Sequence, residues 1–413
     1  MRRKMPTEAE KILARGCGRA RTQAGEIVEV EVDRAMVHDN NAALVIENFG
    51  RISGASVKHP NRAAFFIDHH SPSTTVKATL HHDLMRRFTK EHGIERFHDC
   101  GCGISHVTML EEDLARSGEI VVGTDSHTTG EGARGAFATG IGATEMAAVL
   151  VTGRIWFRVP ETICVIFEGT LPKDTCARDL MNCVLSRFGP EGANYRSVEF
   201  QGDGIDALSF DDRIMCCVMS MEMGAKNAMF VQHPDQHPDP DAEYVRTERF
   251  DLNGIEPNVA VPSSPTNAWP LSEIETQKIR INQAFIGSCT GGLLSDIEKA
   301  AGILRGKKVA KGVRLLVIPA SKKIYGETLS LGYIEALHDA GAIIGSPACG
   351  ACGGHDVGIL AKGEVCVANS PRNMKGRMGA GGAIYLGSAA TVAASAMAGY
   401  VTAYKSDSNG GYD

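Results

Sequence analysis

Five short apolar or β-branched runs, each ending in a cluster of polar residues, constrain the fold of this 413-residue chain most strongly. Apolar runs of this length, bounded by turn residues, are typical of buried strands. In parallel α/β sheets, ligands bind beyond the carboxyl ends of the strands, so the polar clusters fall where a site is expected. The runs are AAFFI before Asp68-His69-His70, EIVVG before Asp125-Ser126-His127, INQAFIG before Ser288-Cys289, GAIIG before Cys349, and EVCVA before Asn369.

Helical patterns alternate with these runs, several of them opened by Ser or Thr as a helix cap. Thr7 followed by Glu10 is a capping-box signal for a first helix from Glu8 to about Arg15. The alternation favours more than one doubly wound α/β unit over a barrel. From His233 to about Glu273 the pattern breaks into Pro-, Asp- and Asn-rich sequence, which predicts a linker. The other predicted helices run over 75–91, 142–153, 295–304, 321–340 and 388–398.

Composition limits the class of protein. An apolar content of 43%, an aromatic content of only 6% and 46 glycines are typical of an α/β protein with many tight turns. The formal charge of −6 provides no basic field for a nucleic acid, so an anionic substrate needs local arginines. The N-terminus has no apolar signal region and no stretch reaches the roughly 20 apolar residues of a membrane span, which predicts a cytoplasmic protein.

Three of the twelve cysteines stand apart. Cys289 lies in FIGSCTGG, and Cys349 and Cys352 form a C-x-x-C in PACGACGGH. A cubic iron–sulfur cluster with three protein thiolates leaves one iron open to bind a substrate oxygen as a Lewis acid. Glycines beside each cysteine fit a bulky inorganic cube that needs close backbone approach. The flanking glycines are Gly287, Gly291, Gly350 and Gly353.

The same three cysteines could also form a zinc site, a redox pair or plain structural thiols. A zinc site needs a second pair, and the nearest candidate, Cys100 and Cys102, is a C-x-C in the other half of the chain. A redox pair leaves Cys289 unexplained. Four further cysteines lie inside apolar runs and are interpreted as core residues: Cys164, Cys216, Cys217 and Cys366.

A set of long motifs resembles the aconitase superfamily, and within it the large subunits of 3-isopropylmalate dehydratase and homoaconitase. They are Asp68-His69-His70, GISH (103–106), GTDSHTTGEGARGAFATGIGATE (123–145), VEFQGDG (198–204), IGSCTGG, CGACGGH and RNMKGRMG (372–379). The resemblance implies three α/β domains around a shared cleft that contains the cluster, without a C-terminal swivelling domain. We place the domains at 1–165, with the first three motifs; at 166–280, with Glu199 and the Pro-rich linker; and at 281–413, which binds the cluster.

Roles for individual residues also follow from the resemblance. Cys289, Cys349 and Cys352 match the thiolates of a 4Fe-4S cluster. Ser126, Arg372 and Arg377 match substrate-binding residues, and the planar guanidinium suits carboxylates. The carboxylates and imidazoles that surround the open iron match Asp68, His69, His106, Asp125, His127 and Glu199.

The chemistry of dehydration agrees with these residue types. Removing a hydroxyl group beside a carboxylate requires a Lewis acid, a proton donor for the leaving oxygen and a base for the neighbouring proton. A histidine paired with a carboxylate can stay protonated near neutral pH, so we predict that Asp68–His69 is the proton donor. Taken alone, the histidines of these motifs could equally be plain loop or capping residues.

No candidate for the base stands out in the sequence. In single-chain aconitases the base is a serine of the swivelling domain. The resemblance therefore implies a separate small subunit that brings the catalytic serine, and the large chain by itself should have little or no activity.

Two departures from the family pattern bear on the substrate. The family usually reads S-C-T-N-G-R after the first ligand, whereas this chain has Gly291 and Leu293 in place of the amide and the guanidinium. It also reads N-R-N-F where this chain has Pro371 and Met374. Missing polar groups beside a cluster change its hydrogen bonding and the substituent that fits.

The main hypothesis is a hydro-lyase that reversibly dehydrates a small 2-hydroxy dicarboxylate of the isopropylmalate or homoaconitate type. A simple hydratase of a malate-like acid, such as a dimethylmalate or maleate hydratase, is the enzymatic alternative. A non-catalytic iron–sulfur scaffold and an RNA-binding homologue are further alternatives, the latter disfavoured by the acidic charge.

Overall fold

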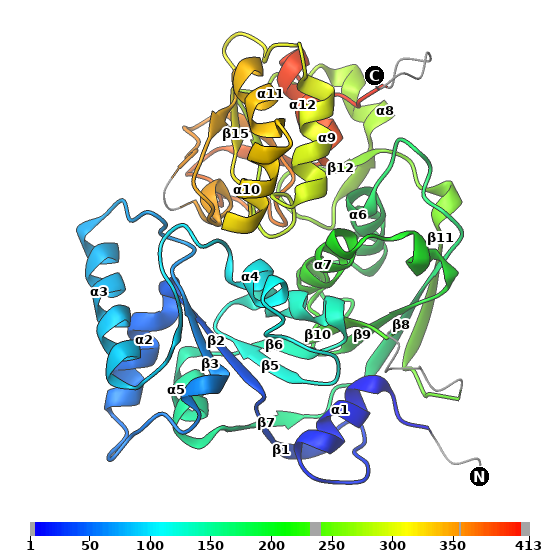
Figure 1. Ribbon diagram of the computed structural model, residues 1–413. Coiled ribbons are helices and arrows are strands. Elements are labelled where there is room, and N and C mark those ends of the chain that lie inside the picture. The colour runs from blue at the N-terminus through cyan, green and yellow to red at the C-terminus, as the bar shows by residue number, and fades with distance from the viewer. Residues whose placement is uncertain (1–4, 232–240, 355–356, 406–413) are drawn as a thin grey trace. The chain divides into compact units, whose positions relative to one another are not determined.

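The computed structural model describes residues 5–231, 241–354 and 357–405 (Figure 1). The chain divides into two compact units that each combine two segments. Unit 1 consists of Met1–Glu168 and Phe188–Phe250, and unit 2 of Gly169–Arg187 and Asp251–Asp413. The predicted boundaries at 165 and 280 stay a prediction, since this two-unit division interleaves the segments instead.

Unit 1 contains a five-stranded sheet in the order β4-β3-β2-β5-β6, with every neighbouring pair parallel. The chain winds outward from β2 to β4 and then returns to the other side of β2, so the switch point lies between β2 and β5. Strands β3 and β5 are buried along their whole length, as their unbroken apolar runs predicted. The strands are β2 (Arg34–His38), β3 (Ala63–Phe66), β4 (Arg96–His98), β5 (Ile120–Gly123) and β6 (Phe137–Gly140).

Helices α2 and α3 lie against each other beside this sheet, with α5 next to α2 (Figure 1). Phe49 of α2 and Phe65 of β3 both contact Phe88 of α3, with ring centroids 5.1 and 5.7 Å apart. The helices of this part are α1 (Glu8–Gly16), α2 (Asp39–Gly50), α3 (Val76–Glu91), α4 (Ser105–Glu111) and α5 (Ala143–Thr152). Thr7 and Glu10 form the predicted capping box of α1.

The rest of unit 1 contains a four-stranded sheet in the order β10-β9-β8-β11 and an antiparallel pair of β1 with β7. The 3-10 helix η2 (Ser126–Arg134) contacts α7 (Phe210–Met219), β6 and β10, so it links the two larger sheets. The strands are β1 (Ile27–Glu31), β7 (Arg154–Arg158), β8 (Thr162–Glu168), β9 (Ser197–Gln201), β10 (Asn227–Phe230) and β11 (Arg246–Asp251).

Unit 2 is built on a seven-stranded sheet in the order β13-β12-β18-β17-β14-β15-β16. Its parallel part winds outward from β14 to β16 and returns to β17 on the other side of β14, as the sheet of unit 1 does around β2. The switch point is therefore between β14 and β17. The strands are β12 (Asn258–Ala260), β13 (Ala268–Pro270), β14 (Gln283–Ile286), β15 (Arg314–Val317), β16 (Ile343–Ile344), β17 (Val365–Ala368) and β18 (Ala383–Leu386).

The helices of unit 2 are amphipathic or apolar segments that cover this sheet, and α9 packs on both α11 and α12 (Figure 1). They are α6 (Ala177–Phe188), α8 (Leu271–Ile274), α9 (Leu294–Leu304), α10 (Lys322–Ser330), α11 (Tyr333–Ala340) and α12 (Ala389–Ala398). Within the parts of the chain that the structure describes, no helix has both the length and the apolar character needed to cross a membrane. The predicted cytoplasmic location stays a prediction.

Two predictions of local structure were wrong. The helix predicted over 321–340 is two helices, because Gly332 adopts a left-handed conformation with φ of 70° between them. The predicted linker contains β11, which is part of the four-stranded sheet, and β12 and β13, which are part of the seven-stranded sheet. Residues 232–240 lie outside the described ones. Proline in edge strands and turns explains the misleading composition.

Candidate active site

The ends of three parallel strands in unit 1 bring the predicted polar residues together. Asp68 and His69 follow β3, Asp125 follows β5, and His38 ends β2, which lies between those two strands. All of these strands point the same way, so their carboxyl ends meet at one edge of the sheet. This edge is the switch point, where α/β sheets bind ligands.

Asp68 and His69 form a buried ion pair. The Nδ1 atom of His69 lies 2.7 Å from Oδ1 of Asp68, and the other carboxylate oxygen accepts from the backbone N–H of Ser105 at 2.8 Å. Burial opposes the charged imidazole, but the carboxylates of Asp68 and Asp125 outweigh it and raise the pKa of His69 well above its usual value. The raised pKa favours the protonated imidazole, which is the form a proton donor needs, and the donor role of His69 stays a prediction.

Asp125 lies between two imidazoles. Its Oδ2 atom is 3.5 Å from Nε2 of His69, and its Oδ1 atom is 3.2 Å from Nε2 of His106. Burial disfavours the carboxylate, yet hydrogen bonds from His106 and His69 hold the pKa of Asp125 well below its usual range. Asp125 also caps η2 by accepting from the backbone N–H of His127 at 2.7 Å.

His106 has a second acidic partner that the sequence analysis missed. Its Nδ1 atom lies 3.2 Å from Oε1 of Glu131, a fully buried residue of η2. Burial lowers the affinity of His106 for a proton, but Glu131 and Asp125 outweigh it and raise the pKa of His106 to about 10. Burial also raises the pKa of Glu131.

His127 contacts another glutamate that the sequence analysis did not select. Its Nε2 atom lies 3.2 Å from Oε1 of Glu222 in the 3-10 helix η4 (Ser220–Met223). Ser126 starts η2 and lines a cavity of about 390 Å³ together with Asp125 and Lys226. We use the name histidine–carboxylate cluster for His38, Asp39, Asp68, His69, His106, Asp125, His127, Glu131 and Glu222.

Asp39 anchors the backbone beneath the Asp68–His69 pair. Its carboxylate accepts from the backbone N–H groups of His69 and His70 at 3.0 and 2.8 Å and contacts Nε2 of His82 at 3.3 Å. The ring of His38 lies 4.5 Å from that of His69, and burial lowers its pKa, so His38 is neutral beside a charged neighbour. A candidate metal site is formed by four residues whose ligand atoms lie within 4.8 Å of one another, namely His38, Asp39, Asp68 and His69. Because the two carboxylates already accept hydrogen bonds from this part of the chain, we interpret them as groups that orient His69.

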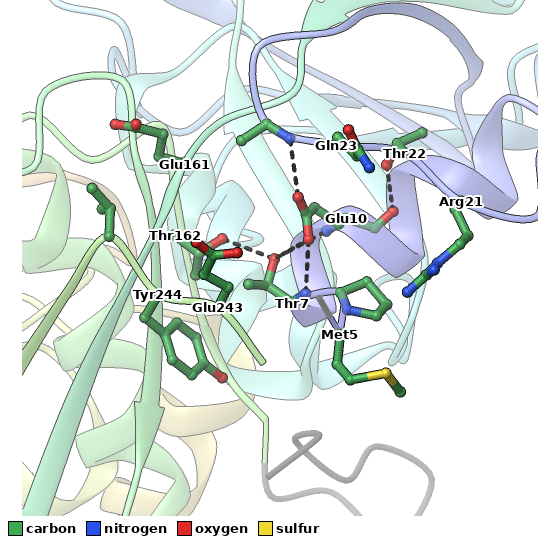
Figure 2. Close-up of a pocket in the computed structure, with 13 residues that line it drawn as sticks. Met5, Thr7, Glu10, Arg21, Thr22, Gln23, Glu161, Thr162, Glu243 and Tyr244 are labelled. Atoms are coloured by element: carbon green, nitrogen blue, oxygen red, sulfur yellow. Dashed lines mark hydrogen bonds between the residues drawn. The ribbon is translucent and has the colours of Figure 1, made fainter. Parts of the chain in front are cut away.

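Glu199 lies elsewhere in unit 1. It is in the middle of β9, where its carboxylate accepts from the backbone N–H of Ala9 at 3.1 Å and from the hydroxyl of Tyr244 at 2.9 Å. Figure 2 shows Tyr244 on the wall of a cavity of about 290 Å³ beside the Thr7–Glu10 capping box. Burial raises the pKa of Glu199 to about 7. Among the described residues, its hydrogen bonds connect it to α1 and Tyr244 rather than to the histidine–carboxylate cluster.

The three predicted ligand cysteines are buried in loops of unit 2. Cys289 follows β14, and Cys349 and Cys352 follow β16, with Cys352 inside the short 3-10 helix η7 (Gly350–Gly353). Their side chains are between 1% and 8% exposed. Three more cysteines of unit 2 have side-chain hydrogen bonds: Cys176 with Asp179, Cys183 with Asn258, and Cys366 with Gln283.

The surroundings of the three predicted ligands combine close backbone packing with a cationic donor. The backbone is closely packed at Gly292, where an added Cβ would lie 2.6 Å from the carbonyl of Ile318, and at Gly354, where it would lie 2.2 Å from that of Arg377. A guanidinium nitrogen of Arg377 is 3.8 Å from the sulfur of Cys352, which suits a thiolate. Three buried thiols with a cationic donor match the ligand set of a 4Fe-4S cluster.

The loop after β17 carries the predicted carboxylate-binding arginines. Asn373 fixes this loop by donating from its side chain to the carbonyls of Val261 at 3.0 Å and Ile384 at 3.2 Å. Arg372 is half-buried directly before it, and Arg377 follows a turn at Gly376, where φ is 83°. Pro371 comes directly before Arg372 in the sequence and is buried. Met374 comes two residues after Arg372 and is 41% exposed.

The sequence contains a sixth strand end that could have identified His38 and Asp39 as site residues. The run RAMV before His38-Asp39 is a short apolar run that ends in polar residues, like the five runs described above. It forms β2, the central strand of the sheet. Glu131 lies in the long motif after Asp125, but neither the spacing nor the composition indicates which way its side chain points. Glu222 lies in an apolar stretch that resembles core sequence.

Comparison with known proteins agrees with this geometry. The model of the aconitase family (aconitate hydratase) matches residues 10–237 and 231–399. The 3-isopropylmalate dehydratase large subunit 1 of Methanopyrus kandleri is 44% identical over 96% of this chain and 98% of its own length. The homoaconitase large subunit of Thermus thermophilus is 42% identical over 96% of each chain.

A solved structure supports the fold. The holo-form of aconitase X from Thermococcus kodakaraensis superposes with a TM-score of 0.53 over 84% of each chain, at 13% sequence identity. The family model and the two relatives extend over almost the whole sequence, including the strand ends and loops described above. This chain therefore belongs to the aconitase family.

Proposed function

We propose that this chain is the large, iron–sulfur-carrying subunit of a hydro-lyase that reversibly dehydrates a small 2-hydroxy dicarboxylate of the isopropylmalate or homoaconitate type. The observation that carries the proposal is the presence of two residue sets in loops that follow strands of the two parallel sheets. One set has two imidazoles of raised pKa that contact Asp125, and the other has three buried thiols. Neither relative described above is named as a simple hydratase, so the comparisons give that alternative no support.

The cysteines Cys289, Cys349 and Cys352 would hold the cluster. When bound, a 4Fe-4S cluster with one iron not ligated by protein supplies a Lewis acid for the substrate hydroxyl and a carboxylate. The chain itself contributes the charges around the substrate. Arg372 and Arg377 bind the carboxylate groups, a role for which the bidentate guanidinium is suited, and Ser126 assists.

His69 donates the proton to the leaving hydroxyl. The C–O bond breaks, the oxygen leaves as water with the proton from Nε2, and a C=C bond forms as the neighbouring carbon loses its own proton. Asp68 holds Nδ1 of His69 at 2.7 Å and so presents Nε2 for this transfer. Asp125 stabilises the charged imidazoles of His69 and His106 before the proton moves.

Glu222 is the carboxylate we assign to the site in addition to Asp125. It is hydrogen-bonded to His127, whereas Glu199 is bonded to α1 and Tyr244. A partner subunit supplies the base for the carbon-bound proton, as the resemblance to two-subunit dehydratases implies. The term "large subunit" in the names of both relatives supports a smaller partner.

A direct assay tests the proposal. The chain, loaded anaerobically with iron and sulfide, is combined with the small subunit and incubated with isopropylmalate, homocitrate and malate-type acids. We expect ultraviolet absorbance of a conjugated unsaturated acid with one of the first two, followed by the isomeric hydroxy acid. An alkene without any isomer would reject the isomerase form, and no absorbance change with any acid would reject the proposal.

A further inference from the structure

Arg178 is the largest fully buried side chain among the described residues, and it lies on α6 in unit 2. Its guanidinium donates to the carbonyl and hydroxyl oxygens of Thr290 at 3.3 and 2.9 Å, and to the carbonyl of Ser370 at 3.4 Å. It also donates to the carbonyl of Asn369. These acceptors belong to two loops. One is the Cys289 loop (287–293), and the other is the Asn369 loop (369–372), which leads into Arg372.

A buried guanidinium is costly unless its donors are used. The Nη1 and Nη2 atoms of Arg178 have four acceptors, and three of them are backbone carbonyls whose burial also requires a hydrogen bond. The geometry therefore makes Arg178 the connection between the loop of the first cysteine and the loop of the predicted carboxylate-binding arginine. The hydroxyl of Thr290 adds a bond to the carbonyl of Asn369 at 3.1 Å.

Asn369 occupies the space that a side chain at position 291 would need. A Cβ added to Gly291 would lie 2.0 Å from Oδ1 of Asn369, far inside contact distance. The Asn369 amide bonds both ends of the Cys289 loop. Its Oδ1 accepts from the backbone N–H of Gly287 at 3.2 Å, and its Nδ2 donates to the carbonyl of Gly291 at 2.9 Å.

We propose that Arg178 and Asn369 are positioning residues that supply, from outside the Cys289 loop, the guanidinium and the amide that Gly291 and Leu293 lack. In this proposal, the amide and the guanidinium missing from the Cys289 loop are replaced by those of Asn369 and Arg178, and we call this replacement the exchange. Gly291 makes room for the Asn369 amide, while Leu293 is buried as an apolar residue at the start of α9, and Arg178 provides the cation. This inference rests on the proposed function only where it assigns the loop to cluster binding.

A pairwise exchange tests the amide. Gly291→Asn alone should collide with Asn369, and Asn369→Ser alone should leave the loop without its amide. We expect each single variant to lose iron and sulfide to a chelator about tenfold faster than the parent chain, a magnitude typical of outer-shell changes. The double variant should return to within about twofold of the parent. If the double variant loses iron and sulfide as fast as expected from the combined effects of the two single variants, the exchange is overturned.

Arg178 is tested in the same way. Arg178→Leu should shorten the lifetime of the cluster about tenfold, and Arg178→Leu with Leu293→Arg should recover part of it. The matched control is Arg314→Leu. Arg314 lies in β15 and donates a hydrogen bond of 2.9 Å to the carboxylate of Glu364, so this change leaves the Cys289 and Asn369 loops in place. A control that loses its cluster as fast as Arg178→Leu would reduce Arg178 to a general contributor to stability and would overturn its positioning role.

The unloaded chain provides a readout that does not depend on activity. The midpoint of urea unfolding is measured for the four members of the Gly291–Asn369 set. Both single variants should shift it downward, and the double variant should restore it. If Gly291→Asn does not fold, Gly291→Ala with Asn369→Ala repeats the comparison with smaller side chains. If the midpoint of the double variant is restored but the complex is inactive, the proposed function is rejected and the exchange is kept. If the midpoint of the double variant is not restored, the exchange is rejected whatever the activity of the complex.

Discussion

Three carboxylates raise the pKa of two buried histidines. Asp68, Asp125 and Glu131 each lie within about 3.5 Å of an imidazole nitrogen of His69 or His106. In this buried setting an ion pair can hold an imidazole charged well above its ordinary pKa. A proton donor that is charged at neutral pH is what the departure of a hydroxyl group requires.

His69→Ala should separate proton transfer from cluster binding. We expect the variant to keep the iron and sulfide content of the parent and to lose turnover by about 100-fold or more, since a positioned acid contributes at least that much. His70→Ala is the matched control, because the ring of His70 contacts Asn40 at 3.0 Å. Normal turnover in His69→Ala would remove His69 from the mechanism.

The roles of the two glutamates can be compared directly. Glu222→Gln should lower turnover of the loaded complex by about 100-fold, because it removes the charge beside His127. Glu199→Gln should leave turnover within about threefold of the parent, since its partners belong to α1 and Tyr244. Steady-state kinetics on both variants decide the question, and the reverse order of effects would return the catalytic role to Glu199.

Glu199 also predicts how stability depends on pH. Its pKa of about 7 in the folded chain is above the ordinary value of 4.5, so its contribution to stability is complete below pH 4.5 and is lost as the pH rises toward 7 and above. The loss is up to about 3 kcal/mol, at 1.36 kcal/mol for each unit of pKa. Glu199→Gln should remove this part of the pH dependence in urea titrations between pH 5 and about 8, and an unchanged pH dependence would contradict the assignment.

At the scale of single residues, the sequence predicted most of the site because its signals are local. Adjacent Asp68 and His69, and the close spacing of Cys349 and Cys352, are short patterns with a chemical reason. Glu222 and Glu131 could not be selected this way, since whether a glutamate points toward a histidine depends on packing of η2 and η4. For the same reason Glu199, which stands in a recognisable motif, could not be distinguished from them.

At the scale of elements, strand ends were predicted well and connections poorly. The apolar runs that end at Asp68, Asp125 and Cys289 correspond to β3, β5 and β14, because strands buried on both faces need continuous apolar sequence. The composition predicted a linker from His233 to about Glu273, because proline, aspartate and asparagine are common in loops. Its strands β11, β12 and β13 are stabilised by pairing with distant strands, which local composition does not reveal.

The contact of η2 with β10 gives a prediction at this scale. A Cβ on Gly132 would lie 1.8 Å from the carbonyl of Ala228, so Gly132→Ala should lower the free energy of unfolding by about 1–3 kcal/mol. Gly50→Ala at the end of α2 meets nothing within 4 Å and should leave stability unchanged or raise it by up to about 1 kcal/mol. Equal effects of the two changes in thermal or urea unfolding would contradict the close packing at Gly132.

At the scale of the whole molecule, the same winding order occurs twice. Each unit starts its parallel sheet at a central strand, winds to one edge and returns to the other side. The loops after these strands carry acids and imidazoles in unit 1, and thiols and arginines in unit 2. The repetition was not evident from the sequence, because the order of strands in a sheet depends on long-range pairing and not on any repeated residues.

The decisive measurement is Mössbauer spectroscopy of the chain loaded anaerobically with ⁵⁷Fe and sulfide, with and without the substrate acid. We predict a 4Fe-4S cluster in which one iron site changes its spectrum when the acid binds, while the irons held by Cys289, Cys349 and Cys352 do not. A cluster that shows no change at any iron site with an acid that the complex turns over, or a loaded chain without inorganic sulfide, would contradict the proposed role of these cysteines.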